Sequence, residues 1–105
     1  MKKAIIYTRT SPDLVSVRTQ IVACRLFAKL NGVEVLRICH DPGENDRKVL
    51  LDLLQNSDTA KWDCVLILDP SVLSDDVCSF LKYREKFNLS SKRVFPVLNY
   101  KEGNK

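Results

Sequence analysis

Residues 3–31, with the sequence KAIIYTRTSPDLVSVRTQIVACRLFAKLN, carry the pattern on which the fold assignment depends. Lys3 to Thr8 is a short apolar stretch rich in β-forming residues, which predicts a strand, and the polar residues Arg9 to Pro12 predict a loop after it. From Pro12 to Asn31 apolar residues recur at helical spacing, and the Asn-Gly pair at 31–32 supplies a helix stop. This stretch therefore predicts a strand, a loop and a helix in succession.

The same alternation continues through the middle of the chain. Val33 to Cys39 predicts a second strand, and the turn residues of His40 to Asp46 predict a second loop. Asn45 or Asp46 can cap a second helix. The inner, apolar stripe of that helix is expected at Val49, Leu50, Leu53 and Leu54.

The last part of the chain repeats the pattern. Cys64 to Leu68 is entirely apolar, which predicts a third strand at the centre of the sheet. Ser74 to Asp76 predicts the cap of a third helix, and Arg93 to Asn99 predicts a fourth strand. The apolar stripe of the third helix is expected at Val77, Cys78, Phe80, Leu81 and Phe87.

Together these elements predict an α/β fold with three layers, α/β/α, and a mainly parallel sheet of about four strands. The strands are expected near residues 3–8, 33–39, 63–69 and 93–98. A chain of 105 residues has the size of a single domain. Its core is expected to span about residues 3–99, followed by a polar tail at 100–105. Such sheets bind ligands beyond the carboxyl ends of their strands, so the loops at 9–16, 40–46 and 69–74 are expected to share one edge.

Composition narrows the class of protein. The formal charge is +4, from 17 Lys and Arg against 13 Asp and Glu, which permits a polyanionic partner without requiring one. The longest apolar runs have the length of a strand, far short of the roughly 20 residues of a membrane span. The apolar stretch after the basic first residues is too short for a signal peptide. We therefore expect a cytoplasmic protein with no membrane partner.

The four cysteines, at positions 24, 39, 64 and 78, lie far apart in the sequence. No pair has the close spacing of a zinc or redox motif, and each lies in an apolar stretch, so buried free thiols are expected. His40 is a lone histidine with no ligand spacing around it. Trp62 and Tyr83 are interpreted as core or helix-flanking residues rather than as platforms for base stacking. Neither a metal nor another cofactor is expected.

The three loops at the predicted edge bring together Arg9, Ser11, Arg47 and Asp69. Two guanidinium groups and a hydroxyl suit a phosphate, because arginine offers paired donors and a permanent positive charge. A structural role for Ser11 is an open alternative. In Ser11-Pro12-Asp13 the hydroxyl could cap the first helix, with proline at the first helical position.

The run Ile6-Tyr7-Thr8-Arg9-Thr10-Ser11, with Gln20 nine residues after the serine, resembles the first-strand motif of the serine recombinases, the resolvase and invertase family. Two further stretches resemble the same family in the same order. They are the Asn-Asp-Arg-Lys segment at residues 45–48, which opens the second helix, and the third strand with its Leu-Ser pair at 73–74. The resemblance covers about residues 4–99 and implies a resolvase catalytic-domain-like fold.

That resemblance implies a specific chemistry. Ser11 would attack a DNA phosphodiester and form a phosphoserine link, while Arg9 and Arg47 would stabilise the charge on the phosphorus. Tyr7 and Gln20 would position the substrate. The family uses no metal, so its arginines must supply the electrostatic stabilisation. The implied partners are DNA and another recombinase subunit, either a second copy of this chain or a different recombinase.

The sequence departs from the family pattern in its third loop. There the family carries an acid and two arginines, and this chain has Ser71, Val72 and Asp75 in their places. Val15 also stands where the family has a glutamine. The long helix and the separate DNA-binding domain that follow in the family are not found in the 105 residues. We therefore expect a degenerate active site with strand cleavage weak or absent in the isolated chain.

Two alternatives stay open. The first is a non-catalytic, recombinase-like module that binds or regulates an active recombinase, which keeps the fold and discards the chemistry. The second is a receiver-like signalling domain, because Asp69 ends the third strand, where receivers are phosphorylated. A receiver also needs an acidic pair after its first strand to hold Mg²⁺, and this chain has Thr8 and Arg9 there.

Overall fold

The computed structural model describes residues 2–43 and 47–98, which form a four-stranded sheet whose strands are all parallel. The strands are β1 (Lys3–Arg9), β2 (Glu34–Asp41), β3 (Cys64–Ile67) and β4 (Arg93–Pro96). Their order across the sheet is β2-β1-β3-β4, so β1 and β3 are the two inner strands. The predicted parallel sheet and the central place of the third strand are both confirmed.

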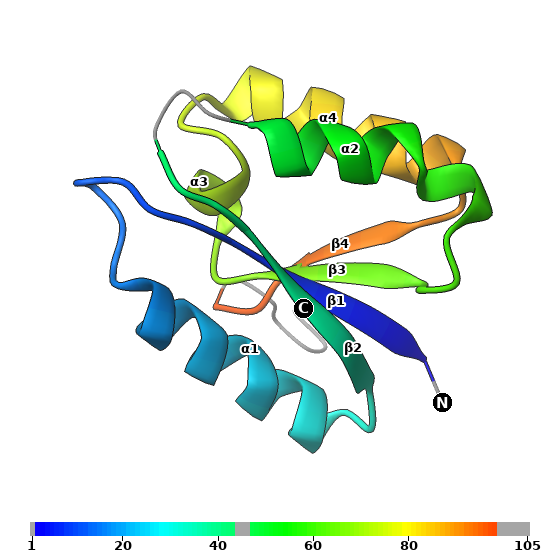
Figure 1. The fold of residues 1–105 in the computed structure, drawn as a ribbon, viewed down its shortest axis with the longest axis horizontal. Helices are drawn as coiled ribbons and strands as arrows, with labels where there is room; N and C mark the ends of the chain where they lie inside the picture. The colour runs from blue at the N-terminus through cyan, green and yellow to red at the C-terminus, as the bar shows by residue number, and fades with distance from the viewer. Residues whose placement is uncertain (1, 44–46, 99–105) are drawn as a thin grey trace, which may run out of the picture.

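Helices cover both faces of this sheet. They are α1 (Val17–Leu30), α2 (Lys48–Gln55), α3 (Pro70–Leu73) and α4 (Val77–Leu89), with a short 3₁₀ helix at Ser57–Thr59. In Figure 1, α1 lies alone on one face of the sheet, while α2 and α4 lie on the other. The predicted three-layer α/β/α arrangement is therefore confirmed.

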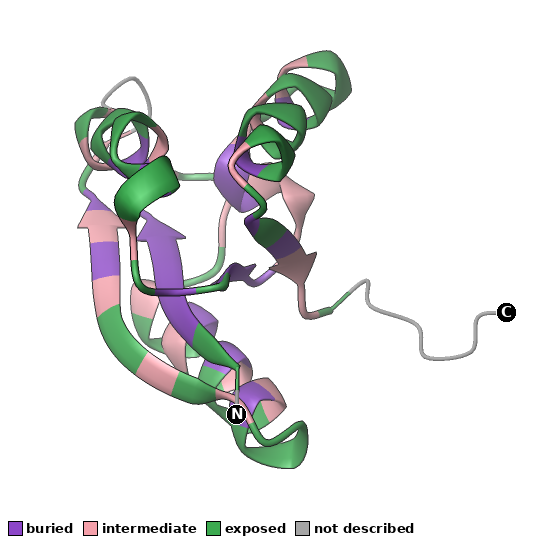
Figure 2. Cartoon of the chain, turned by 90° about the vertical axis from the view of Figure 1, so that its right-hand side faces the viewer, coloured by how far each residue is buried: buried purple, intermediate pink, exposed green. Residues whose placement is uncertain are grey.

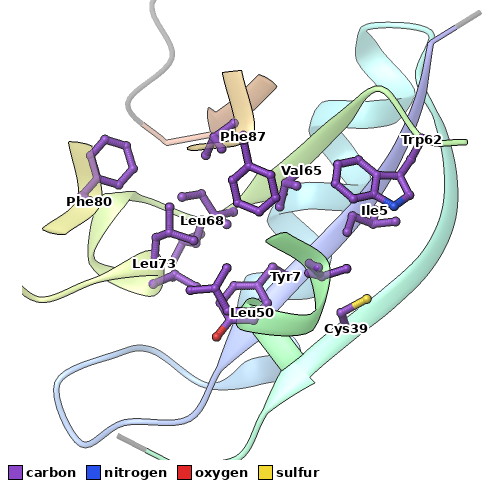
Figure 3. Packing of buried hydrophobic residues seen from close by; sticks show 14 residues of the cluster. Ile5, Tyr7, Cys39, Leu50, Trp62, Val65, Leu68, Leu73, Phe80 and Phe87 are labelled. Carbon is purple, nitrogen blue, oxygen red and sulfur yellow. The ribbon is translucent and has the colours of Figure 1, made fainter. Parts of the chain in front are cut away.

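Each face of the sheet has its own apolar cluster. The cluster under α2 and α4 includes Tyr7, Leu50, Trp62 and Phe87, and Figure 3 shows the rings of Trp62 and Phe87 close together. The smaller cluster under α1 is built from Ala4, Ile6, Cys24, Ala28, Cys64 and Leu66. The inner strands are buried on both sides, whereas the helices bury one side and expose the other (Figure 2). Trp62 belongs to the core, as predicted, and the partly buried Tyr83 packs against it.

Helix α1 begins later than the sequence predicted. Pro12 and Asp13 form a turn, in which the Leu14 amide donates to the Ser11 carbonyl at 3.0 Å. The helix begins at Val17, and the Ser16 hydroxyl accepts from the Thr19 amide. The alternative in which Ser11 caps this helix is wrong, because Ser16 occupies the capping position.

Helix α2 receives its cap from a neighbouring strand. Both carboxylate oxygens of Asp41, at the end of β2, accept from the first helical amides, those of Val49 at 2.9 Å and Leu50 at 3.1 Å. The predicted caps, Asn45 and Asp46, lie outside the described residues. The predicted inner stripe is confirmed, with Leu50 and Leu53 buried and Val49 and Leu54 packed against the same cluster.

The third loop and third helix also differ from the prediction. The segment predicted as a loop contains α3. The predicted cap is confirmed, because Asp76 caps α4 by accepting from the amides of Cys78 and Ser79. The predicted stripe of α4 holds only at Phe80 and Phe87. Val77, Cys78 and Leu81 are exposed because α4 meets the sheet through a narrower face. Three cysteines are buried as predicted, but Cys78 is not.

No helix in the described part of the chain, residues 2–43 and 47–98, is both long and apolar enough to cross a bilayer.

Candidate active site

The carboxyl ends of β1, β2 and β3 meet at one edge of the sheet, as parallel strands require, and α3 lies over that edge (Figure 1). Arg9 is the last residue of β1, Arg47 directly precedes α2, and Val72 lies in α3. Three segments that are distant in sequence therefore contribute to one site.

Arg9 is fully buried, which is uncommon for an arginine and requires acceptors around it. Its Nε donates to the Val72 carbonyl at 3.0 Å, and its Nη2 donates to the Ser71 carbonyl at 2.6 Å. Nη2 also forms an ion pair with Asp75 Oδ1 at 3.1 Å. Nη1 has no hydrogen-bond partner among the described residues. The guanidinium is thus held by α3 and by Asp75, two residues beyond it.

Arg47 approaches the same carbonyl. Its Nη1 donates to Val72 O at 3.3 Å, so both guanidinium groups meet at a single oxygen atom. Two positive charges held this close repel each other unless an anion lies between or beside them. Asp75 supplies one negative charge to Arg9, and its side chain remains 69% exposed. The two cations therefore share one neutral acceptor, and the Asp75 carboxylate pairs with Arg9 at the outer surface of the site.

Ser11 lies two residues beyond Arg9, on the loop that leaves β1, and is half-buried. Its hydroxyl oxygen accepts a long hydrogen bond from the Asp13 amide, at 3.4 Å. Because Ser16 caps α1, the Ser11 hydroxyl is not needed as a helix cap. The structure thus places Arg9, Arg47 and the Ser11 loop at one edge, and brings the two arginines into direct proximity.

Tyr7 and Gln20, which the family resemblance marks as substrate-positioning residues, are both buried and bonded within the protein. The Tyr7 hydroxyl donates to Asp41 Oδ2 at 2.6 Å. Burial raises the pKa of Tyr7 well above its usual range, and the nearby Asp41 raises it further, whereas Arg47 acts in the opposite direction. The Gln20 amide donates to the carbonyls of Arg9 and Val15. Gln20 therefore holds the backbone of Arg9, whereas Tyr7 bonds a side chain at the end of β2.

The remaining polar residues at this edge have local partners. Asp69 caps α3 by accepting from the amide and hydroxyl of Ser71, the duty of a helix cap. His40 lies between two threonines, with Nδ1 at 2.9 Å from Thr8 Oγ1 and Nε2 at 3.3 Å from Thr10 Oγ1. In the described ranges no group of three or more His, Cys, Asp or Glu side chains could hold a metal ion.

Sequence reasoning missed two contributors to the site. The Val72 carbonyl, which receives both arginines, is a backbone atom and has no sequence signal. Asp75 was interpreted as a loss of positive charge, but in the structure it also partners Arg9. The pairing could have been expected, because a buried arginine needs a counterion and Asp75 follows the third strand at the same edge.

Comparison with solved structures identifies the fold. The catalytic domain of TP901-1 integrase matches with a TM-score of 0.80 and 23% identity, over 92% of this chain and 78% of that one. ISC1926 TnpA, an IS607-like serine recombinase, matches in its catalytic domain with a TM-score of 0.77 and 25% identity, over 90% and 70% of the two chains. A resolvase family site-specific recombinase from Streptococcus pneumoniae gives a TM-score of 0.84 at 17% identity, over 100% and 78%.

No model of a protein family matches the sequence, and no curated protein matches it significantly. The chain therefore has the fold of serine recombinase catalytic domains at low sequence identity. The structures that it resembles are those of an integrase catalytic domain, an IS607-like serine recombinase catalytic domain and a resolvase family site-specific recombinase.

Proposed function

We propose that this protein is a serine recombinase-type DNA strand transferase domain with an attenuated active site. In the proposed reaction the Ser11 oxygen forms a bond to a DNA phosphorus, and the bond from that phosphorus to the 3′ oxygen breaks. The serine proton passes to solvent and the departing 3′ oxygen gains one. The product is a phosphoserine link to the 5′ end, and rejoining reverses these steps.

The observation that carries this proposal is the meeting of Arg9 and Arg47 at the Val72 carbonyl, at the edge that also bears Ser11. Guanidinium groups fixed by the fold are the groups that a phosphoryl transfer without metal needs, because they stabilise charge without rearranging. The likeness of the fold to serine recombinase catalytic domains supports the same assignment.

The attenuation follows from how Arg9 is engaged. Three of its hydrogen bonds go to groups of the protein, and one of these groups is the Asp75 carboxylate. A phosphate oxygen must compete with that carboxylate for the same guanidinium, and the two anions also repel each other. In addition, Val72 is fully buried, so the position where the family has an arginine here belongs to the core.

The Arg9–Asp75 ion pair also favours a second candidate function, a non-catalytic module that associates with an active recombinase subunit. An internal counterion allows the fold to keep a buried arginine with no substrate present. In that case Ser11 would have no chemical role, and the partner would be another recombinase subunit rather than a DNA phosphate.

The test is a trap for covalent complexes on DNA of unspecified sequence. The protein is incubated with a pool of duplexes of randomised sequence, stopped with detergent, and analysed by mass spectrometry for phosphoserine at residue 11. We expect no detectable adduct with the unmodified chain. Asp75→Asn keeps the shape of the side chain and removes the competing charge, so it should produce adducts that disappear in the Asp75→Asn, Ser11→Ala double variant.

Asp13→Asn is the matched control, because it removes an exposed carboxylate from the Ser11 loop without touching Arg9. It should leave adduct formation as in the unmodified chain. Circular dichroism confirms that each variant is folded. If folded Asp75→Asn protein gives no adduct, either alone or mixed with a second recombinase subunit, the strand transferase proposal is wrong and the non-catalytic module stands.

A further inference from the structure

A polar groove lies at the opposite end of the sheet from Ser11. It has a volume of about 670 Å³ and lies between the last turns of α4 and the open side of β4. The polar residues that line it are Arg84, Asn88, Ser91, Lys92 and Arg93. Since β4 begins at Arg93, the groove adjoins the amino end of that strand, away from the edge that bears Ser11 (Figure 1).

The charge of this groove has one sign. Its lining contains arginine, lysine, asparagine and serine but no carboxylate. Arg84 and Arg93 are exposed, and among the described residues neither guanidinium has an acidic partner. The Arg84 guanidinium lies 5.7 Å from the centre of the Phe80 ring, which restricts its motion. Lys92 is engaged elsewhere, since its ammonium donates to the Ala60 carbonyl over the Trp62 ring.

Ser91 has a left-handed backbone conformation, which glycine adopts more readily than serine. Its φ is 63°, in the left-handed region, where glycine is the usual choice at the end of a helix. The turn is closed by hydrogen bonds from the Ser91 amide to Asn88 O and from the Lys92 amide to Phe87 O, both at 2.9 Å. The chain therefore accepts a strained serine at a position that lines the groove, and such outliers gather at binding sites.

We infer that this groove binds phosphate groups of a nucleic-acid backbone, as a contact separate from the Ser11 site. Two guanidinium groups offer paired donors to phosphate oxygens, and the Ser91 hydroxyl and Asn88 amide add uncharged donors. The inference rests on the proposed function in one respect, because a DNA strand transferase binds DNA, and DNA is the nucleic acid expected in the groove. A free phosphate compound would satisfy the same donors, so the experiment must separate these two sources.

The first measurement is the binding of a fluorescently labelled 20-base-pair duplex, followed by anisotropy over a series of KCl concentrations. Each phosphate contact contributes about 0.9 to the slope of log K against log salt. Arg84→Gln with Arg93→Gln should therefore lower that slope by nearly 2 and weaken binding about tenfold or more. The matched control, Arg18→Gln with Arg25→Gln, removes two exposed arginines from α1 and should change the slope by less than half as much.

A second variant separates binding from folding. Ser91→Gly relieves the left-handed strain and removes the hydroxyl, so it should raise the melting temperature and weaken duplex binding. A purely structural Ser91 would give higher stability with unchanged binding, which would count against the hydroxyl contact. No cleavage is measured in these titrations, so failure of the Ser11 chemistry would leave their outcome unchanged.

Inorganic phosphate is titrated separately and followed by amide NMR shifts at Ser91 and Arg93. Weak, unsaturated shifts together with saturable duplex binding are the expected result. Saturation by inorganic phosphate without duplex binding would assign the groove to a small phosphate compound and overturn the nucleic-acid assignment. A wild-type salt slope in the Arg84, Arg93 double variant would overturn the site altogether.

Discussion

At the scale of single residues, the burial of Arg9 is the feature on which the site depends. Removing a guanidinium from water costs several kcal/mol unless its donors are satisfied. Here backbone carbonyls of α3 take up much of that requirement, and an acid at the surface balances the charge. Because Asp75 is largely exposed, the pair is partly screened by solvent, and its carboxylate is free to leave. The cation is permanent, whereas its counterion can be exchanged.

Asp41 makes several hydrogen bonds at once, because it caps α2 and also accepts a hydrogen bond from the Tyr7 hydroxyl. Asp41→Ala should destabilise the fold by about 3 kcal/mol, since it leaves two helix amides and a buried hydroxyl without acceptors. Tyr7→Phe removes only one of these bonds and should cost about 1 kcal/mol. Urea denaturation gives both values. Equal costs for the two variants would show that the α2 cap contributes nothing.

At the scale of elements, the two serines before α1 have different roles: Ser16 caps the helix, whereas Ser11 is the candidate nucleophile. Ser16→Ala removes the hydroxyl that accepts from the Thr19 amide and should lower the free energy of unfolding by about 1 kcal/mol. Ser11→Ala removes only a long hydrogen bond in a turn and should cost less than about 0.5 kcal/mol. Thermal denaturation of the two variants side by side measures the difference. A larger loss for Ser11→Ala would return Ser11 to a structural role.

The elements that could be predicted from sequence are those whose apolar residues follow a clear helical or strand pattern. All four strands lie within a few residues of their predicted places, because runs such as Cys64 to Leu68 are apolar on both faces, as a buried parallel strand requires. The start of α1 was predicted five residues early, since Ser11-Pro12-Asp13 and Ser16 both look like helix caps. Local sequence does not choose between them.

The site was less predictable than the fold. That Arg9 and Arg47 lie at one edge follows from strand order, which the alternation of elements predicts. Their meeting point does not follow, because it is a carbonyl of α3, a four-residue helix that was expected to be a loop. The Asp41 cap was missed for a similar reason. Its partners are backbone amides, which every sequence has.

At the scale of the whole molecule, the two apolar clusters predict how the cysteines react. Burial raises the pKa of Cys24 to about 12 and that of Cys64 to about 11, and Cys39 is also buried. Because the thiolate is the reactive form, Cys24 and Cys64 should resist alkylation at pH 8 while the protein is folded. Burial of Cys39 should limit the access of the reagent to that thiol. Exposed Cys78 should react, giving one equivalent of label in native protein and four in urea.

Intact-mass spectrometry after brief iodoacetamide treatment counts the labels. Cys78→Ser is the control and should give no label in the folded state and three in urea. Rapid native labelling of Cys24 would show that α1 detaches from its face of the sheet.

The order of strands in the sheet has a consequence for synthesis on the ribosome. Strand β1 pairs with β2 on one side and with β3 on the other, and its β3 partners, Cys64 to Leu66, are made about 60 residues after it. At translation rates of about 5–20 residues per second, that interval lasts about 3–12 s. During it, β1, α1 and β2 can assemble while one long edge of β1 has no strand beside it. A nascent chain that pauses before β3 is made exposes this unpaired edge of β1 to other chains. Slower translation through α2 should therefore increase the fraction of the protein that aggregates.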